Sequence, residues 1–168
     1  MNTEVHNLAA PSTQDALALL SADHRRIDEL FGDIERLGHD GSSAADRSGL
    51  LARLGGQLRT HTRIKQEIFY PALASSGAAD ARTLADAAAD LDEILARLES
   101  LAQLDSTAEE GAATTVAQDI EVLAQLVRAH VSEEKKLLFP QARSLDLATL
   151  GTQMALHQGE LLADQGVD

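Results

Sequence analysis

Apolar residues recur at spacings of three and four along four stretches of the chain, each about twenty residues long. That period places them on one face of an α-helix, so each stretch is predicted to be an amphipathic helix. The inner positions, in chain order, are Leu17, Leu20, His24, Ile27, Phe31 and Ile34; Leu51, Leu54, Leu58, His61, Lys65 and Ile68; Leu84, Ala87, Leu91, Ile94, Leu98 and Leu101; and Ile120, Leu123, Val127, His130, Glu134 and Leu137. Four such helices with short connections predict an all-α fold, an antiparallel up-down four-helix bundle.

The bundle is expected to form one domain over residues 12–145 of the 168 residues. Residues 1–11 are expected to be an N-terminal tail that ends at Pro11. A shorter fifth helix over about 146–164 is expected to pack on the bundle through Leu150, Met154 and Leu161, with a short tail completing residues 146–168.

Composition and charge indicate the type of secondary structure, the kinds of partner and the location to expect. Hydrophobic residues make up 44% of the chain but aromatic residues only 2%, which favours helices over strands. The net charge of -13 argues against nucleic acid and anionic membranes as partners. There is no cysteine, no apolar run long enough to span a bilayer, and no secretion signal at the N-terminus, so a cytoplasmic protein is expected. A protein partner is conceivable, and the chain is expected to be a monomer or a homodimer.

Two segments of the chain are variants of one motif. His61 to Pro71 and His130 to Pro140 each begin with His, end with Pro ten positions later, and carry an aromatic residue directly before that Pro. The copies differ one helical turn after the His, where the second has Glu134 and the first has Lys65. A His and a carboxylate one turn apart can both serve as metal ligands in a helical bundle.

Polar residues interrupt the predicted inner faces at one level. His24, His61 and His130 each replace an apolar residue on a different helix, and Lys65 and Glu134 are two further ionisable groups on these faces. Burying such groups is costly unless they pair with one another or bind a metal ion. We therefore expect these five side chains to converge inside the bundle.

Together these motifs resemble the hemerythrin-like (HHE) domain family over roughly residues 15 to 145. The resemblance implies a four-helix bundle that holds a non-haem di-iron centre, with known roles in oxygen binding, in iron or oxygen sensing, and in handling nitric oxide or peroxide. By this resemblance His24 corresponds to the metal ligand on the first helix and His61 to the His ligand on the second helix. His130 and Glu134 correspond to the His and Glu ligands on the fourth helix.

Two positions depart from the ligand set that the resemblance implies. Lys65 stands where the second helix should carry a bridging Glu, and Leu91 stands where the third helix should carry a His. One iron would then keep only His130 and a share of Glu134, so we do not expect a full di-iron centre. The other would keep His24, His61 and Glu134, which suffice for one Fe(II) or other divalent ion with open positions.

Three hypotheses follow, and the sequence favours a role that is not enzymatic. The first is a binding or regulatory module with little or no metal, in which a Lys65–Glu134 ion pair balances the charge of the degenerate site. The alternative is a mononuclear non-haem iron, or other divalent-metal, protein that binds or senses O2, NO or peroxide. The third is a structural bundle that recognises a protein partner through its acidic surface.

Overall fold

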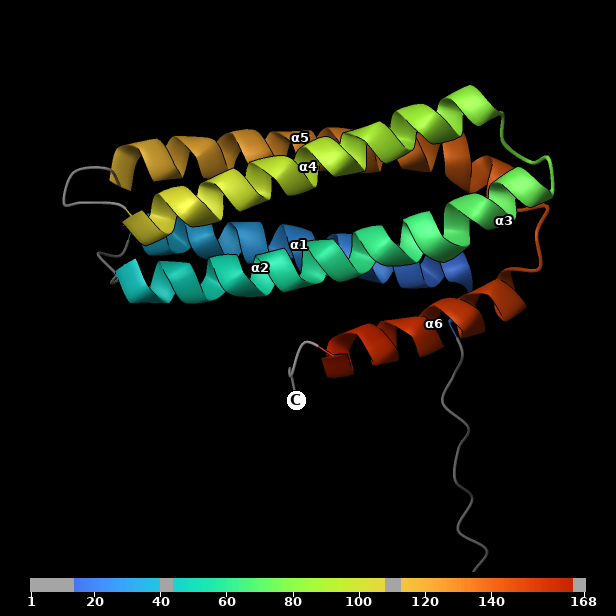
Figure 1. Ribbon diagram of the computed structural model, residues 1–168, viewed down its shortest axis with the longest axis horizontal. Coiled ribbons are helices and arrows are strands. Elements are labelled where there is room, and N and C mark those ends of the chain that lie inside the picture. The colour runs from blue at the N-terminus through green and yellow to red at the C-terminus, as the bar shows by residue number, and fades with distance from the viewer. Residues whose placement is uncertain (1–13, 40–43, 108–112, 165–168) are drawn as a thin grey trace, which may run out of the picture.

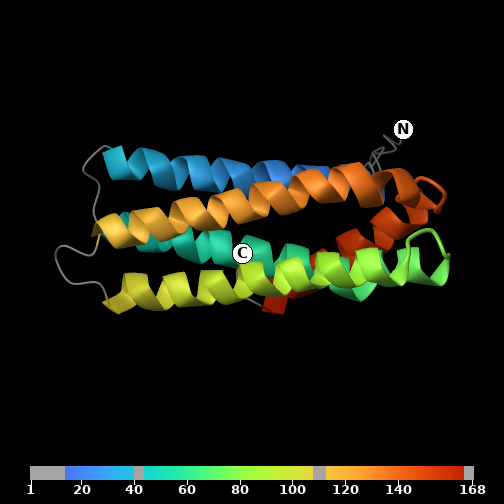
Figure 2. The same ribbon diagram turned by 90° about the horizontal axis from the view of Figure 1, so that it is seen from above.

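The computed structural model describes residues 14–39, 44–107 and 113–164, and these form helices throughout apart from short connections (Figure 1). The helices are α1 (Ala16–His39), α2 (Ala44–Ile64), η1 (Lys65–Phe69), α3 (Tyr70–Ser75), α4 (Ala81–Thr107), α5 (Ala113–Ala142) and α6 (Leu147–Asp164). Four long rods, α1, α2, α4 and α5, lie side by side, and α6 crosses the outside of the bundle at one end (Figures 1 and 2). The predicted all-α bundle with a C-terminal helix is thereby confirmed.

Aspartate residues begin three of the helices. The backbone N–H groups of Ala18, Thr83 and Thr149 donate to the carboxylates of the Asp residues three positions earlier, at 2.8, 2.9 and 3.1 Å. Those acceptors are Asp15 before α1, Asp80 before α4 and Asp146 before α6. Each carboxylate satisfies a backbone donor that the first turn of a helix leaves free, and its charge suits the positive end of the helix dipole.

The apolar core consists of two clusters that a polar layer separates. On α1 the buried residues of one cluster precede His24 and those of the other follow it. On α2 and α5 the order of the two clusters around His61 and His130 is reversed, because these helices run antiparallel to α1. One cluster contains Phe31, Leu54 and Leu123; the other contains Phe69, Leu138 and Met154. The layer therefore crosses the bundle at one level, as the sequence predicted.

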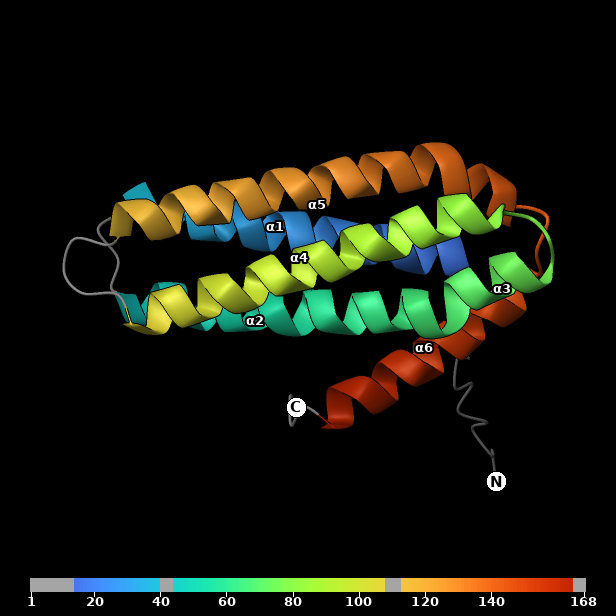
Figure 3. The ribbon, with the colours of Figure 1, turned by 45° about the horizontal axis from the view of Figure 1, so that its top comes forward.

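A wide helical turn follows the first copy of the repeated motif. Residues Lys65–Phe69 form a π-helix, in which the backbone N–H of Tyr70 donates to the carbonyl of Lys65 five residues earlier. The chain changes direction there and continues as α3 (Figure 3). The extra residue of a π turn shifts the inner face by about one position, so Phe69 is fully buried and Ile68, which we predicted to be inside, is only partly buried.

The second copy departs from the predicted inner face at the equivalent position. Leu137 is 42% exposed, whereas Leu138 is 1% exposed. Pro140 lies inside α5 and removes one backbone donor from its last turns. Both copies therefore bury the residues at offsets of four, eight and twelve after the His: Lys65, Phe69 and Leu73, and Glu134, Leu138 and Ala142.

The C-terminal helix packs closely on the start of α1. Leu150, Met154 and Leu161 are buried, as predicted, and the space for a Cβ at Gly151 is taken by the backbone of residues 14–16. His157 of α6 also pairs with Glu67 of η1. Within the described part of the chain, no helix combines the length and the apolar character that a membrane span requires.

Candidate metal centre

The five polar side chains predicted to converge do lie together inside the bundle. His24 comes from α1, His61 from α2, Lys65 from η1, and His130 and Glu134 from α5. Their exposed fractions are between 0% and 6%. Side chains from four elements are thus buried together.

Three of these residues form a group suited to a cation. His24, His61 and Glu134 each offer one ligand atom, and these atoms lie within 4.8 Å of one another. Nε2 of His24 is 3.1 Å from Oε2 of Glu134, and the two imidazole centroids are 4.9 Å apart. Nδ1 of His24 is buried and has no hydrogen-bond partner among the described residues. Two imidazoles and a carboxylate match the donor types that Fe(II), Mn(II) and Zn(II) accept.

A buried carboxylate orients the His61 ring. Nδ1 of His61 lies 3.2 Å from Oδ2 of Asp23, which leaves Nε2 free for another partner. Asp23 is 2% exposed and also accepts hydrogen bonds of 3.2 Å from the amides of Gln57 and Gln158. Such a carboxylate fixes the tautomer and the orientation of a metal-binding imidazole and makes it a better ligand.

The second buried imidazole of the repeat also faces a carboxylate, at a longer distance. Nδ1 of His130 lies 3.5 Å from Oδ2 of Asp90 of α4, which is half-exposed. Sequence reasoning missed both carboxylates, although the helical spacing contained the signal. Asp23 lies three residues after Leu20 and four before Ile27, which places it on the inner face of its helix. Asp90 has the same spacing from Ala87 and Ile94, but it lies at the edge of that face and its side chain is half-exposed.

Lys65 lies between the remaining partners. Its Nζ is 2.7 Å from Nε2 of His130 and 2.8 Å from Oε1 of Glu134, and both its side chain and that of Glu134 are 0% exposed. The Tyr70 ring adds a cation–π contact, with its centroid 5.6 Å from the amine. The predicted proximity of Lys65 and Glu134 is thus present, and the amine occupies the space that faces His130.

Leu91 contributes no ligand. It is 2% exposed and belongs to the apolar cluster around Phe69. Among the described residues of α4, the side chain that reaches the layer is that of Asp90, which approaches His130 from outside.

The environment keeps two of the imidazoles neutral. Burial lowers the pKa of His61 to about 4, with Lys65 and His24 adding to the effect and Asp23 opposing it. Burial, followed by the charge of Lys65, lowers the pKa of His130 to about 3. Neutral imidazole has the free lone pair that a metal ion requires.

The buried ion pair is shifted toward an ionised carboxylate. Burial alone would raise the pKa of Glu134, but Lys65 and then His24 hold it well below its usual value. Burial lowers the pKa of Lys65, whereas the Glu134 charge opposes that change and favours the ammonium. The ionised carboxylate of Glu134 therefore lies beside His24, and the Lys65 amine lies beside His130.

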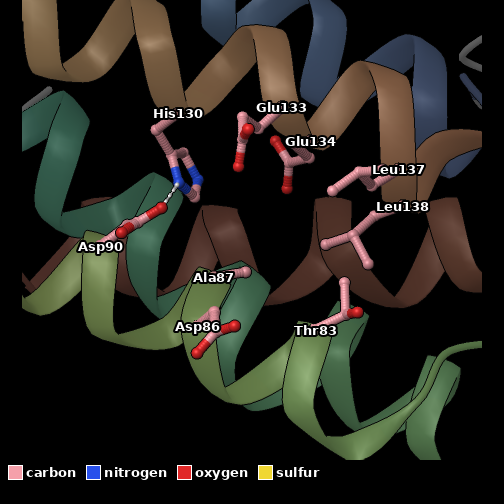
Figure 4. A pocket seen from close by; sticks show the side chains of 9 residues that line it. All are labelled: Thr83, Asp86, Ala87, Asp90, His130, Glu133, Glu134, Leu137 and Leu138. Carbon is pink, nitrogen blue, oxygen red and sulfur yellow. Dashed lines mark hydrogen bonds and ion pairs between the residues drawn. The ribbon is translucent and has the colours of Figure 1, made fainter.

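A small cavity leads from the surface toward this layer. It has a volume of about 100 Å³ and lies between α4 and α5, where His130 and Glu134 form its inner wall (Figure 4). Asp86, Asp90 and Glu133 stand around it. The space is large enough for a few water molecules or a diatomic molecule.

The chain matches the model of a known protein family. The model of a family described as Hemerythrin HHE cation binding domain matches residues 15–142, which is more than half of the chain. No curated protein and no solved structure matches the chain.

Proposed function

The chain belongs to the hemerythrin family of HHE cation-binding domains, and from that premise we propose that it binds one divalent metal ion through His24, His61 and Glu134. The observation that carries the proposal is that one ligand atom from each lies within 4.8 Å of the others, inside the bundle. A bound ion with three protein ligands supplies open coordination positions for a small molecule such as O2, NO or peroxide.

The protein's own residues prepare this group for a cation. Asp23 holds Nδ1 of His61, which directs Nε2 away from that carboxylate. The lowered pKa of His61 keeps the ring neutral, so no proton has to leave it before a metal ion binds. The unpartnered Nδ1 of His24 is a buried polar atom of the kind that bound ions often explain.

Lys65 supports a count of one ion. Its Nζ contacts His130 and Glu134, the two residues that the resemblance assigns to the second iron. An ammonium there supplies the positive charge that a second metal ion would otherwise bring to Glu134. We therefore propose that Lys65 substitutes for the second cation, and that Glu134 divides its two oxygens between the metal site and the amine.

A binding or regulatory module with no metal is the second candidate, and the same ion pair favours it. Lys65 already balances the charge of Glu134, and its own charge would oppose a divalent ion nearby. This candidate differs from the first in metal content alone, so one titration separates them.

The first prediction concerns stoichiometry. Metal-free full-length protein, titrated with Fe(II) without oxygen or with Co(II) as a coloured probe, is expected to bind one equivalent. His61→Ala removes one of three ligands, so it should weaken binding at least tenfold. His157→Ala, which changes a histidine paired with Glu67 on the outside of the bundle, should bind as the unaltered protein does.

Two other results would reject the proposal. Binding of two equivalents would mean that Lys65 does not replace the second ion. Absence of binding would leave the metal-free module as the better account.

A further inference from the structure

The C-terminal helix α6 carries a polar residue among the apolar ones of its inner face. Gln158 lies four residues after Met154 and three before Leu161, both of which are buried. That spacing directs its side chain toward the bundle, and it is half-buried there. An amide that gives up part of its contact with water needs a hydrogen-bond partner within the protein.

Gln158 finds that partner in Asp23 of α1. Its Nε2 donates to Oδ1 of Asp23 at 3.2 Å and lies 3.4 Å from Oδ2. Asp23 is 2% exposed, and its Oδ2 lies 3.2 Å from Nδ1 of His61. One amide on α6 thus contacts both oxygens of the carboxylate that orients a proposed metal ligand.

The other side chains around Asp23 contact a single oxygen of it. Gln57 of α2 donates to Oδ1 at 3.2 Å, and the exposed guanidinium of Arg26 is 3.8 Å from the same atom. Gln158 also reaches Oδ2, the oxygen that faces His61. Without this amide the carboxylate would be freer to turn away from the imidazole.

Other residues fix α6 against the bundle, so the helix does not depend on Gln158 for its position. Its buried apolar side chains and the close approach at Gly151 hold it, and it lies against α1, α2 and η1 (Figure 3). The helix begins at Leu147, beyond the residues 15–142 that the family model matches. The contact with Asp23 therefore comes from outside the matched part of the chain.

We propose that Gln158 is a positioning residue for His61, through which α6 sets the affinity of the metal site. Its amide holds Asp23 so that Oδ2 accepts a hydrogen bond from Nδ1 of His61, which leaves Nε2 of that ring with a free lone pair. The effect on affinity rests on the proposed metal binding, whereas the effect on the His61 ring does not.

Gln158→Leu tests the proposal, because leucine suits the inner face but has no amide. In the metal-free, full-length chain, NMR of the His61 ring nitrogens should show one tautomer with its proton on Nδ1. The variant should show exchange between the two tautomers. Its affinity for Co(II) should fall by about three- to tenfold, toward the lower end of the effect of a residue that supports a metal ligand.

Two control variants separate this role from a structural one. Gln153→Leu makes the same substitution on the exposed face of α6. His157→Ala removes the neighbouring contact of α6 with Glu67 but keeps the amide of Gln158. Both should keep the tautomer of His61 and the affinity for Co(II), whereas a general loosening of α6 would alter these readouts in His157→Ala as well.

The proposal is overturned if Gln158→Leu keeps the single tautomer of His61, if it binds Co(II) as tightly as the unaltered chain, or if His157→Ala has the same effects. If the unaltered chain binds no Co(II), the proposed function fails, while the tautomer measurement still decides whether Gln158 positions His61.

Discussion

At the scale of single residues, the two oxygens of Glu134 serve two different partners. Oε2 is 3.1 Å from His24 and Oε1 is 2.8 Å from Lys65. Loss of either partner would leave a buried carboxylate with a single contact, which is costly in a medium that screens charge poorly. The charge of Lys65 therefore matters to the stability of the fold as well as to any ligand.

The second prediction is that Lys65→Met destabilises the metal-free protein by about 3–5 kcal/mol, the usual cost of removing one partner of a buried ion pair. Methionine has a similar shape, so the loss would come from the unpaired charge of Glu134 rather than from a cavity. Urea unfolding followed by circular dichroism measures the change.

A double variant separates charge from packing. Lys65→Met with Glu134→Leu removes both charges and should recover most of the lost stability, because an apolar pair can replace a buried ion pair at little cost. If Lys65→Met alone is as stable as the unaltered protein, the ion pair does not contribute to the stability of the fold.

The third prediction is that acid destabilises the fold before most carboxylates titrate. His61 and His130 have pKa values of about 4 and about 3 in the native state, whereas the ordinary value is 6.5. Below pH 6.5 these rings become protonated in the unfolded chain but stay neutral in the native state. The stability is therefore complete above 6.5 and is lost as the pH falls toward the native values, by roughly 2–4 kcal/mol between pH 6.5 and 5.

Urea midpoints measured without metal across this pH range test that expectation. His130→Leu removes one of the two rings and should flatten the dependence by about half. The lowered pKa of Glu134 acts in the same direction, but only below its ordinary value of 4.5. An unchanged midpoint between pH 6.5 and 5 would mean that the two rings are protonated in the native state.

At the scale of helices, the contact of α6 with α1 depends on one glycine. A Cβ at Gly151 would lie 2.3 Å from the carbonyl oxygen of Gln14 and 2.8 Å from the backbone nitrogen of Ala16. Those atoms belong to the backbone, so they cannot move aside as a flexible side chain could. Gly159 of the same helix is a natural comparison, because a Cβ there would meet no heavy atom of the described residues within 4 Å.

The fourth prediction uses this pair of glycines. Gly151→Ala should cost about 1–3 kcal/mol, because the methyl group forces α6 away from the start of α1. Gly159→Ala should instead stabilise the protein by up to about 1 kcal/mol, since alanine favours a helix. Thermal unfolding of both variants measures the two effects, and a stabilising Gly151→Ala would contradict the packing described for α6.

The sequence predicted the helices better than it predicted their inner faces near the two prolines. Regular spacing was sufficient as far as Lys65 and Glu134. Beyond them, Leu137 was wrongly placed inside, and Ile68 packs against the core but is only partly buried. Phe69 and Leu138 take those positions. In the first copy a π turn follows, and it depends on backbone hydrogen bonds that apolar spacing does not record. The second copy continues as an α-helix, so a π turn does not explain the exposure of Leu137.

The sequence predicted the central side chains of the candidate site but not the carboxylates around them. The convergence of His24, His61, Lys65, His130 and Glu134 follows from their shared place on the inner faces. The carboxylates of Asp23 and Asp90 were not foreseen, because aspartate on a helix is usually exposed and only the three-dimensional arrangement pairs each with an imidazole.

At the scale of the whole molecule, repulsion among acidic side chains opposes compactness in addition to the conformational entropy that any chain loses on folding. The chain has 27 acidic residues against 14 lysines and arginines, and several exposed carboxylates lie along the same helices. Repulsion among them weakens the folded state more than the expanded unfolded chain, and dissolved salt screens it.

The fifth prediction is that the urea midpoint rises as NaCl increases from about 0.01 M to about 0.3 M and then levels off, because the screening length falls below the spacing of surface charges. Glu99→Lys is a matched variant: it lies on the exposed face of α4 and changes the net charge by two units, from -13 to -11. It should be more stable than the unaltered protein at low salt and should show a smaller rise. A midpoint that falls with salt would mean that attractive pairs such as Arg128–Asp28 outweigh the repulsion, and the acidic surface would then stabilise this bundle rather than strain it.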